Sequence, residues 1–472
     1  MRAHEAGALH ADGYRGPSWL RPPDDVNALV PQLWAQSVRR APTGRLEVAG
    51  VPVDRIAAEY GTPAYVVDER DFRARAGAFR DAFADAFADL CGGADIYYAG
   101  KAFLTTEVAR WIAEEGLSLD TCTGGELAVA LRAGVPLQRI GLHGNNKSDA
   151  EIARALDAGI GRIVVDSLGE IDRIADAAAK RGVRAPVLLR VTVGVEAHTH
   201  SYIATAHEDQ KFGLSLSEGV AREAVARTLA RPELELMGLH SHIGSQIFDV
   251  QGFEVAARRV LGLHAEVVRE HGVTLPELDI GGGFGIAYTT EHDPLPPAEL
   301  ARGMADIIGK ECADLGVDVP RISAEPGRAI AGPSTFTLYT VGTTKDVGLD
   351  GGGTRRYVAV DGGMSDNIRT ALYDADYSAT LAGRCSDAGP LLSRVVGKHC
   401  ESGDVVVKDE FLPADIGPGD LLAVPGTGAY CRSLSNQYNH VPRPPVLAVR
   451  DGEVRVLLRR ETEDDLFALD MG

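Results

Sequence analysis

The sequence predicts an α/β protein that consists of a (β/α)8 TIM-type barrel followed by a C-terminal all-β domain. Eight short apolar or β-branched runs recur between residues 96 and 327, each followed by a turn and by an Ala-, Arg- and Glu-rich segment of helical character. The first five runs begin 21 to 25 residues apart, which is the span of one strand, one helix and two short loops. Such alternation forms either a doubly wound sheet or a barrel, and the number of runs favours the barrel.

The chain order of these runs defines the expected domains. The predicted barrel strands are Ile96–Lys101, Leu117–Thr121, Ile140–Gly144, Arg162–Ser167, Val187–Thr192, Leu236–Ile243, Glu277–Gly283 and Arg321–Gly327. After about residue 335, strand-and-turn patterns replace the helical periodicity, at Thr335–Gly342, Tyr357–Asp361, Val405–Lys408, Leu421–Pro425, Val446–Val449 and Val454–Leu458. We therefore expect an N-terminal extension over 1–45, a barrel over 69–335, and a β-domain formed by 46–68 together with 336–472.

Composition limits the classes of partner and the compartment. The 472 residues carry 48 Lys and Arg against 67 Asp and Glu, a net charge of −19, which argues against nucleic-acid and anionic-membrane partners. The six cysteines include no CxxC pair, so they indicate neither a disulfide framework nor a zinc site. The chain has no apolar run of transmembrane length, and its first 20 residues lack the apolar core of a signal peptide. We expect a cytoplasmic protein.

One lysine stands where barrel enzymes place their chemistry, at the C-terminal end of a strand. Only eight lysines occur, and only Lys101 ends an apolar strand, although Lys147 and Lys211 follow the third and fifth strands and could also face the site. Apolar walls would favour the neutral amine that a Schiff-base nucleophile requires. A lysine that extends its amine into solvent at the barrel mouth fits the position equally well.

Glycines after the seventh strand and an arginine after the eighth suggest a phosphate site. Gly281-Gly282-Gly283-Phe284-Gly285 would present consecutive backbone N–H groups, and Glu325-Pro326-Gly327-Arg328 adds a guanidinium. Barrels often bind phosphate with the loops after these two strands. A lysine combined with phosphate donors fits pyridoxal 5′-phosphate, a phosphorylated aldehyde cofactor.

Histidines on the sixth strand admit two uses. His240 and His242 lie two residues apart and share a strand face. They could bind a metal, as could Glu196-Ala197-His198-Thr199-His200, but neither pair has a clear third ligand at matching spacing, so we predict no metal site. Stacking on a flat cofactor ring is the better use of His242.

Five segments occur in a recognisable order along the chain. They are Tyr98-Ala99-Gly100-Lys101-Ala102, His240-Ser241-His242-Ile243-Gly244-Ser245-Gln246, Gly281-Gly282-Gly283-Phe284-Gly285, Glu325-Pro326-Gly327-Arg328 and Cys400-Glu401-Ser402-Gly403-Asp404. Together they resemble the motif series of the diaminopimelate decarboxylase family, which belongs to the fold type III pyridoxal-phosphate decarboxylases and is related to alanine racemase. The resemblance runs from about residue 60 to residue 450.

The resemblance implies a role for each cofactor-binding residue. Lys101 would bind the cofactor covalently, His242 would stack on its ring, and Glu325 would pair with the pyridine nitrogen. The remaining cofactor-binding positions implied by the family are Ser245, Gly283, Gly285, Pro326, Gly327, Arg328 and Tyr430. Asp120 and Arg190 match supporting positions.

The resemblance also implies a substrate, meso-2,6-diaminopimelate, which would be converted to L-lysine and CO2. Cys400, as proton donor, and Glu401 would come from the second subunit of a homodimer. Arg328, Arg369 and Tyr373 would hold the distal carboxylate of the substrate, a group whose geometry suits a guanidinium. Glu401 would meet the distal ammonium, and Tyr430 would contact both cofactor and substrate.

Three other activities remain open from the sequence. A decarboxylase of the same fold could act on ornithine, arginine or a carboxynorspermidine-like substrate, and Arg369 and Tyr373 argue against this. An alanine racemase needs a second base opposite Lys101 and is usually shorter. A non-catalytic pyridoxal-phosphate-binding protein is usually a lone barrel. Gln437 departs from the family's serine/asparagine run, and the stretch from Glu196 to Lys211 is a candidate loop to close over the substrate.

Overall fold

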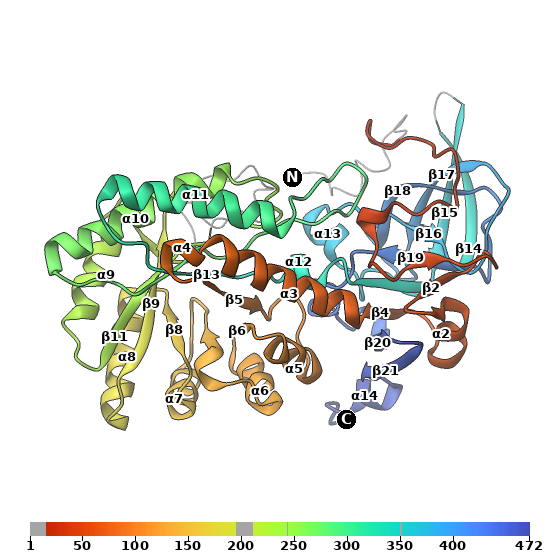
Figure 1. The fold of residues 1–472 in the computed structure, drawn as a ribbon. Helices are drawn as coiled ribbons and strands as arrows, with labels where there is room; N and C mark the ends of the chain where they lie inside the picture. Colours follow the sequence, from red (N-terminus) through yellow and green to blue (C-terminus); the bar gives the residue numbers. More distant parts are fainter. Residues whose placement is uncertain (1–15, 195–210, 243, 350–351) are drawn as a thin grey trace. The chain divides into compact units, whose positions relative to one another are not determined.

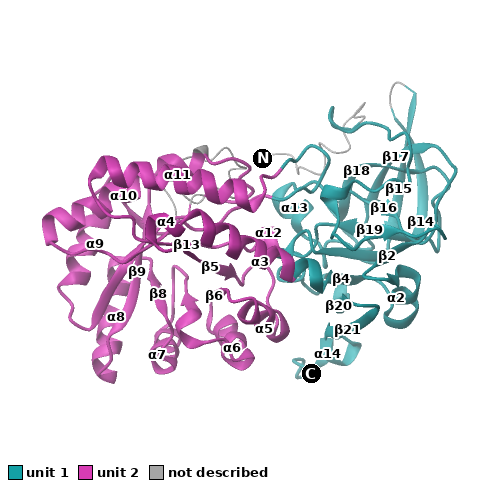
Figure 2. Cartoon of the chain, in the orientation of Figure 1, with its two compact units in different colours: residues 1–72, 286–293, 331–472 teal, residues 73–285, 294–330 magenta. Residues whose placement is uncertain are grey.

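A computed structural model describes residues 16–194, 211–242, 244–349 and 352–472. The chain divides into two compact units, coloured separately in Figure 2. The barrel unit comprises residues 73–285 and 294–330, and the β-rich unit comprises residues up to 72, 286–293 and 331–472. Each unit is described by itself below.

Eight parallel strands close into a barrel. Their bounds are β5 (Ala94–Ala99), β6 (Ser118–Thr121), β7 (Ile140–Leu142), β8 (Arg162–Val165), β9 (Ala185–Thr192), β11 (Leu234–His240), β12 (Glu277–Asp279) and β13 (Arg321–Ala324). Neighbours in the chain are neighbours in the sheet; β8 pairs with β9, and the ring closes between β13 and β5. A ninth short strand, β10 (Leu214–Ser215), pairs with β9 outside this ring. All eight predicted strands and the predicted TIM-type barrel are confirmed.

Helices alternate with the strands and lie around the barrel (Figure 1). They are α3 (Glu69–Ala86), α4 (Ala88–Cys91), α5 (Thr106–Glu114), α6 (Gly124–Ala133), α7 (Asp149–Ala158), α8 (Leu168–Arg181), α9 (Val220–Leu229), α10 (Gln251–His271), α11 (Pro297–Leu315) and α12 (Arg328–Ala331). Local signals set several of their ends. The side chains of Thr105, Thr123 and Ser148 cap α5, α6 and α7, and Gly134 and Gly159 end α6 and α7 in the left-handed conformation. Among the described residues, no helix is long and apolar enough to cross a membrane.

The barrel strands are apolar because both of their faces are covered. Every residue of β6, β7 and β8 is buried. Tight backbone approaches explain two of the glycines that follow β12. A Cβ on Gly282 would lie 2.1 Å from the carbonyl oxygen of Glu325, and Gly281 has a φ of +71°. These two glycines let the chain after β12 lie against the end of β13.

The β-rich unit is built on one large sheet, which confirms the β-rich C-terminal domain. Its strands are β4 (Ala64–Asp68), β14 (Thr335–Leu349), β15 (Gly353–Val360), β16 (Thr380–Leu381), β17 (Pro390–Val396), β18 (Val405–Pro413), β19 (Leu421–Pro425), β20 (Val446–Arg450) and β21 (Glu453–Leu458). The main order is β18-β17-β15-β14-β4-β20-β21, with β19 paired to β14 and β16. Short helices α2 (Val53–Tyr60), α13 (Arg369–Tyr373) and α14 (Glu463–Phe467) complete the unit.

Residues before β4 contribute to the core of this unit. Strands β1 (Arg39–Arg40), β2 (Leu46–Val48) and β3 (Val51–Pro52) form a small sheet of their own. Leu33 and Trp34 are buried in the same cluster as Leu46 and Phe336, and the rings of Trp34 and Phe336 are 5.9 Å apart. The described part of the segment before residue 46 therefore stabilises the fold of the unit through apolar packing.

Candidate active site

A pocket opens in the barrel unit at the C-terminal ends of the strands, where barrel enzymes carry their chemistry. It encloses about 660 Å³ including its open mouth, which is within the size range of small-molecule sites. Polar and glycine residues from most of the strand ends line it: Ala99, Gly100, Lys101, Asp120, Thr121, Cys122, Glu126, His143, Gly144, Arg190, Phe212, His240, His242 and Glu325.

The structure separates the three candidate lysines. Lys101 lines the pocket in the turn after β5 and is exposed, so the apolar burial that we expected for its amine is not found. Lys147 is buried, and its Nζ donates to Glu170 Oε2 at 3.0 Å and to the carbonyl of Val164 at 2.6 Å. Burial lowers the pKa of Lys147, although Glu170 opposes that shift. Lys211 is exposed and lies over the ring of Phe212. Lys101 is therefore the candidate nucleophile of the three.

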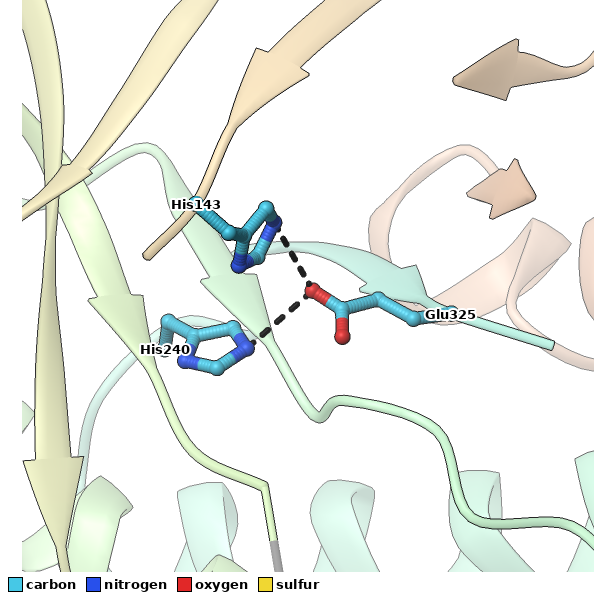
Figure 3. A group of neighbouring side chains, drawn as sticks. All are labelled: His143, His240 and Glu325. Carbon is cyan, nitrogen blue, oxygen red and sulfur yellow. Dashed lines mark ion pairs between the residues drawn. The ribbon is translucent and has the colours of Figure 1, made fainter. Parts of the chain in front are cut away.

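Two imidazoles and one carboxylate converge within the pocket (Figure 3). His143 Nε2 lies 3.3 Å from Glu325 Oε1, and His240 Nε2 lies 3.1 Å from the same oxygen. Burial lowers the pKa of both histidines to about 3 and raises that of Glu325. Both rings are accordingly neutral at physiological pH, with one N–H each.

A buried ion-pair network continues from this group into the barrel. Asp120 Oδ1 lies 3.1 Å from His143 Nε2 and 3.6 Å from Arg162 Nη2. Arg162 in turn reaches Asp279 Oδ2 at 2.5 Å, and Ser323 Oγ donates to the same oxygen at 2.7 Å. Burial raises the pKa of Asp120 to about 7, despite the opposing charge of Arg162. The Arg162 guanidinium offsets part of the negative charge of Asp120 and Asp279 in the barrel interior.

His242 lines the pocket and is contacted by the glycine loop. Its Nδ1 accepts the N–H of Gly282 at 3.1 Å, and burial holds its pKa well below the usual value. An acceptor at Nδ1 leaves the proton of a neutral ring on Nε2. The ring is therefore fixed by the same loop that we expected to bind phosphate.

The N–H groups of the loop after β12, which we expected to bind phosphate, are partly used in hydrogen bonds within the protein. The N–H of Gly281 is donated to Asp279 Oδ1, that of Gly282 to His242, and that of Gly285 to the carbonyl of Ile247. These three groups do not point out together as a row of phosphate donors. Arg328 instead donates from Nη2 to Ser245 Oγ at 2.8 Å, which places a guanidinium and a hydroxyl side by side. This pair is the better anion site.

The β-rich unit holds the expected substrate residues Arg369 and Tyr373, both on α13. Arg369 is buried; its Nη1 donates to the hydroxyl of Tyr377 at 2.5 Å, and its guanidinium carbon lies 4.7 Å from the ring centre of Tyr288. These contacts hold the guanidinium in one orientation. Tyr373 is half-buried.

Cys400 and Glu401 lie in an exposed loop between β17 and β18 of the same unit. The backbone N–H of Cys400 donates to Asn439 Oδ1 at 3.0 Å. Tyr430, half-buried, has a φ of +63°. Gln437, which departs from the family pattern, donates from Nε2 to Glu461 Oε2 at 3.2 Å. Its side chain therefore has a specific partner.

Comparison with known proteins gives the chain its family. The family model of the pyridoxal-dependent decarboxylases, for the pyridoxal binding domain, matches residues 71–332. The diaminopimelate decarboxylase of Mycobacterium tuberculosis is 56% identical over 447 residues, which cover 94% of this chain and 98% of that protein. This chain belongs to the diaminopimelate decarboxylase family.

Other members of the family agree with that assignment. The diaminopimelate decarboxylase of Bacillus subtilis is 44% identical, over 91% of this chain and 95% of that protein. The crystal structure of the M. jannaschii diaminopimelate decarboxylase in complex with L-lysine matches with a TM-score of 0.86 at 30% identity, covering 93% of this chain and 98% of that one. The cofactor of this pyridoxal-dependent family is pyridoxal 5′-phosphate.

The residues of the barrel pocket fit this cofactor. Lys101 is accessible for a covalent bond, and Arg328 with Ser245 offers donors for a phosphate. Both carboxylate oxygens of Asp120 are buried and form no hydrogen bond with a described residue, as expected where a ligand supplies the missing donor, and the Glu325 carboxylate lines the same pocket. The pocket thus offers an amine for the covalent bond and a carboxylate for the ring nitrogen, and the loops after β11 and β13 add the Arg328–Ser245 pair for an anionic group.

Several functional neighbours were missed by sequence reasoning. His143 directly follows β7, so reading every residue after a strand end would have found it. Arg162 begins β8 and Asp279 ends β12, and charged residues at the ends of buried strands signal a buried pair. The sequence showed no further potential metal ligand for His240. In the structure, potential ligand atoms of His143 and Glu325 lie within 4.8 Å of that of His240. The candidate metal residues Glu196, His198 and His200, and almost all of the candidate closing loop, lie outside the described residues.

Proposed function

We propose that this protein removes the carboxylate at the D centre of meso-2,6-diaminopimelate, producing L-lysine and CO2. The observation that carries the proposal is the barrel pocket in which Lys101 and the buried carboxylate of Glu325 line one space. Curated diaminopimelate decarboxylases at 44% and 56% identity support it, as does the relative crystallised with L-lysine. When bound, pyridoxal phosphate supplies an aromatic ring that accepts the electron pair left by the departing CO2.

The barrel residues bind and orient the cofactor. Lys101 provides its amine for the covalent bond, and Arg328 and Ser245 hold the phosphate by charge and hydrogen bonding. His242 would stack on the cofactor ring, and Glu325 would pair with the pyridine nitrogen and keep it protonated, so that the ring can accept electrons. Gly283, Gly285, Pro326, Gly327 and Tyr430 complete the cofactor site in this proposal.

The distal end of the substrate is an amino acid group that takes no part in bond breaking. Arg328, Arg369 and Tyr373 would bind its carboxylate, and Glu401 its ammonium. The packing of Arg369 against Tyr288 and Tyr377 fixes the guanidinium in advance, which lowers the entropy lost on binding. The same groups reject ornithine, because ornithine has no distal carboxylate.

Cys400 completes the reaction as proton donor. The bond between Cα and the carboxylate carbon breaks, CO2 leaves, and the electron pair left at Cα takes the proton of the Cys400 thiol. The thiolate then regains a proton from solvent. Because Cys400 and Glu401 lie in an exposed loop, we propose that they enter the pocket of a second copy in a homodimer.

The protein is proposed to work in the cytoplasm and without a metal ion. Purified protein reconstituted with pyridoxal phosphate should release lysine and CO2 from meso-diaminopimelate, with ornithine in parallel giving no product. Prolonged dialysis against a chelator should leave that rate unchanged. Lysine formation that depends on added metal would contradict the site proposed here.

A further inference from the structure

The imidazoles of His143 and His240 are not accounted for by any of the roles above. Both lie against one oxygen of Glu325, at 3.3 Å and 3.1 Å, and they come from two non-adjacent strands, after β7 and at the end of β11. Figure 3 shows both contacts reaching Oε1. The second carboxylate oxygen, Oε2, takes part in neither contact. One oxygen of Glu325 is thus contacted by a ring nitrogen from each of the two histidines.

We propose that His143 and His240 are positioning residues that keep Glu325 ionised and aimed at the cofactor's pyridine nitrogen. The inference rests on the proposed function for the presence of that nitrogen. His240 is 1% exposed, and Glu325 is the only carboxylate within ion-pair distance of it among the described residues, so His240 contributes most to holding Glu325. His143 Nε2 is shared, because Asp120 Oδ1 lies 3.1 Å from it.

The charge balance explains why such holders are needed. Glu325 is 7% exposed, and burial raises its pKa, with the nearby charge of Asp120 adding to the shift. The positive charges of Arg162 and Lys101 lower the pKa of Glu325 and so oppose that shift. Arg190 is a further cation that interacts with Glu325, whose charge raises the pKa of Arg190. Asp279 acts on His240, where it favours the charged ring. Burial and the neighbouring Asp120 thus both favour the protonated form of Glu325, and additional hydrogen-bond donors would oppose that tendency.

Neutral imidazoles are suited to this task. The pKa of each ring is lowered to about 3, so neither becomes cationic in the working range, and each has one N–H to offer. Nε2 of each ring and Oε1 of Glu325 form no hydrogen bond of regular geometry with any described residue, although the N···O distances between them are only 3.3 Å and 3.1 Å. Buried polar atoms in this position are costly unless they satisfy one another. A small rotation that directs the N–H of either ring at Oε1 would stabilise the ionised carboxylate.

Paired substitutions separate a donor role from a packing role. His240→Leu and His143→Leu remove the N–H, whereas His240→Gln and His143→Gln keep an N–H donor on a side chain of similar reach. His264→Leu is the matched control, because His264 is also a buried histidine of the barrel unit, on α10, and does not line the pocket.

The first measurement needs no turnover. The pH dependence of the bound cofactor's absorption band and the cofactor dissociation constant are measured without substrate. For His240→Leu we expect the acidic transition of the band to move up by about one pH unit and the dissociation constant to rise about tenfold, the effect of losing a hydrogen bond to a charged group. His143→Leu should give a smaller shift in the same direction. Both Gln variants should stay within about twofold of the original protein.

The second measurement is the pH profile of kcat. Activity requires ionised Glu325, and loss of a donor raises its pKa, so the acidic limb should move to higher pH in the Leu variants and activity should recover as pH rises. His264→Leu should leave the limb in place. An acidic limb that is unchanged in both Leu variants, or that moves to lower pH, overturns the proposal. Loss of thermal stability without a shift of the limb would show that the two histidines only pack in the core.

Glu325→Gln distinguishes failure of this inference from failure of the proposed function. If Glu325→Gln lowers kcat and adding His240→Leu lowers it no further, the histidine acts through Glu325. If Glu325→Gln lowers kcat but the histidine variants shift nothing, only the positioning role fails. If Glu325→Gln has no effect on cofactor binding or turnover, the proposed role of Glu325 fails, and the positioning role fails with it.

Discussion

His399 Nδ1 lies 2.8 Å from Asp404 Oδ2, and both side chains are buried beside the exposed Cys400 loop. Asp404 also accepts the backbone N–H of His399 at 2.7 Å and that of Met364 at 2.6 Å. Met364 begins the segment that leads to α13 and Arg369. One carboxylate therefore ties the loop of the proposed proton donor to the segment of the proposed substrate arginine, within the same unit.

Asp404→Asn should disturb both segments at once. We expect kcat to fall about tenfold or more, because small displacements of a reacting group are costly, while cofactor affinity stays unchanged. Steady-state kinetics and the rate of Cys400 alkylation check this. Asp346→Asn is the control, since Asp346 pairs with Arg356 at an exposed site. Equal kcat values for the two variants would show that the contacts of Asp404 with His399 and Met364 do not affect turnover.

Cys400→Ala should separate cofactor binding from turnover. The thiol lies outside the barrel unit that binds the cofactor, so the absorption spectrum should be retained. Loss of the proton donor should lower kcat by roughly 10²–10⁴-fold. Spectra and lysine release are measured on the same sample. Cys385→Ala, at another exposed cysteine of the same unit, should keep full activity. Unimpaired lysine production by Cys400→Ala would remove it from the mechanism.

Two lysines should give opposite phenotypes. Lys147→Met leaves Glu170 buried without its cation, which we expect to destabilise the fold by about 3–5 kcal/mol. Adding Glu170→Gln should recover part of that loss. Lys101→Ala should keep the thermal stability of the cofactor-free protein but lose the covalent bond, as tested by borohydride reduction and mass spectrometry. Cofactor found on Lys147 would reverse the two roles.

Asp120 predicts a pH dependence of stability. Its folded pKa, about 7, is above the reference value of 3.8, so the proton is bound more tightly in the folded state. The resulting stabilisation is fully present below about pH 4 and is lost as pH rises through 7. Asp120→Asn should therefore gain thermal stability relative to the original protein progressively between pH 4 and 7. A melting-temperature difference that stays constant over this window would contradict the buried, protonated carboxyl group.

The strand order and the nucleophile were predictable because their signals are local. Runs of apolar residues at a regular spacing identify buried parallel strands, and position after a strand end identified Lys101. The neighbours His143, Arg162 and Asp279 come together only when the barrel closes, since they are far apart in the chain. The partners of the N–H groups of Gly281, Gly282 and Gly285 likewise could not be predicted from the sequence, because they depend on how the loop folds. The packing of Leu33 and Trp34 depends on contacts with Phe336, which sequence spacing does not encode.

Product analysis is the decisive test of the proposed decarboxylation of meso-diaminopimelate to L-lysine. Protein reconstituted with pyridoxal phosphate is incubated with the substrate, and L-lysine and CO2 are quantified together. We expect lysine and CO2 in equimolar amounts from the original protein, and neither product from Lys101→Ala. Failure to form lysine while the cofactor is bound at Lys101, or faster CO2 release from ornithine, would contradict it.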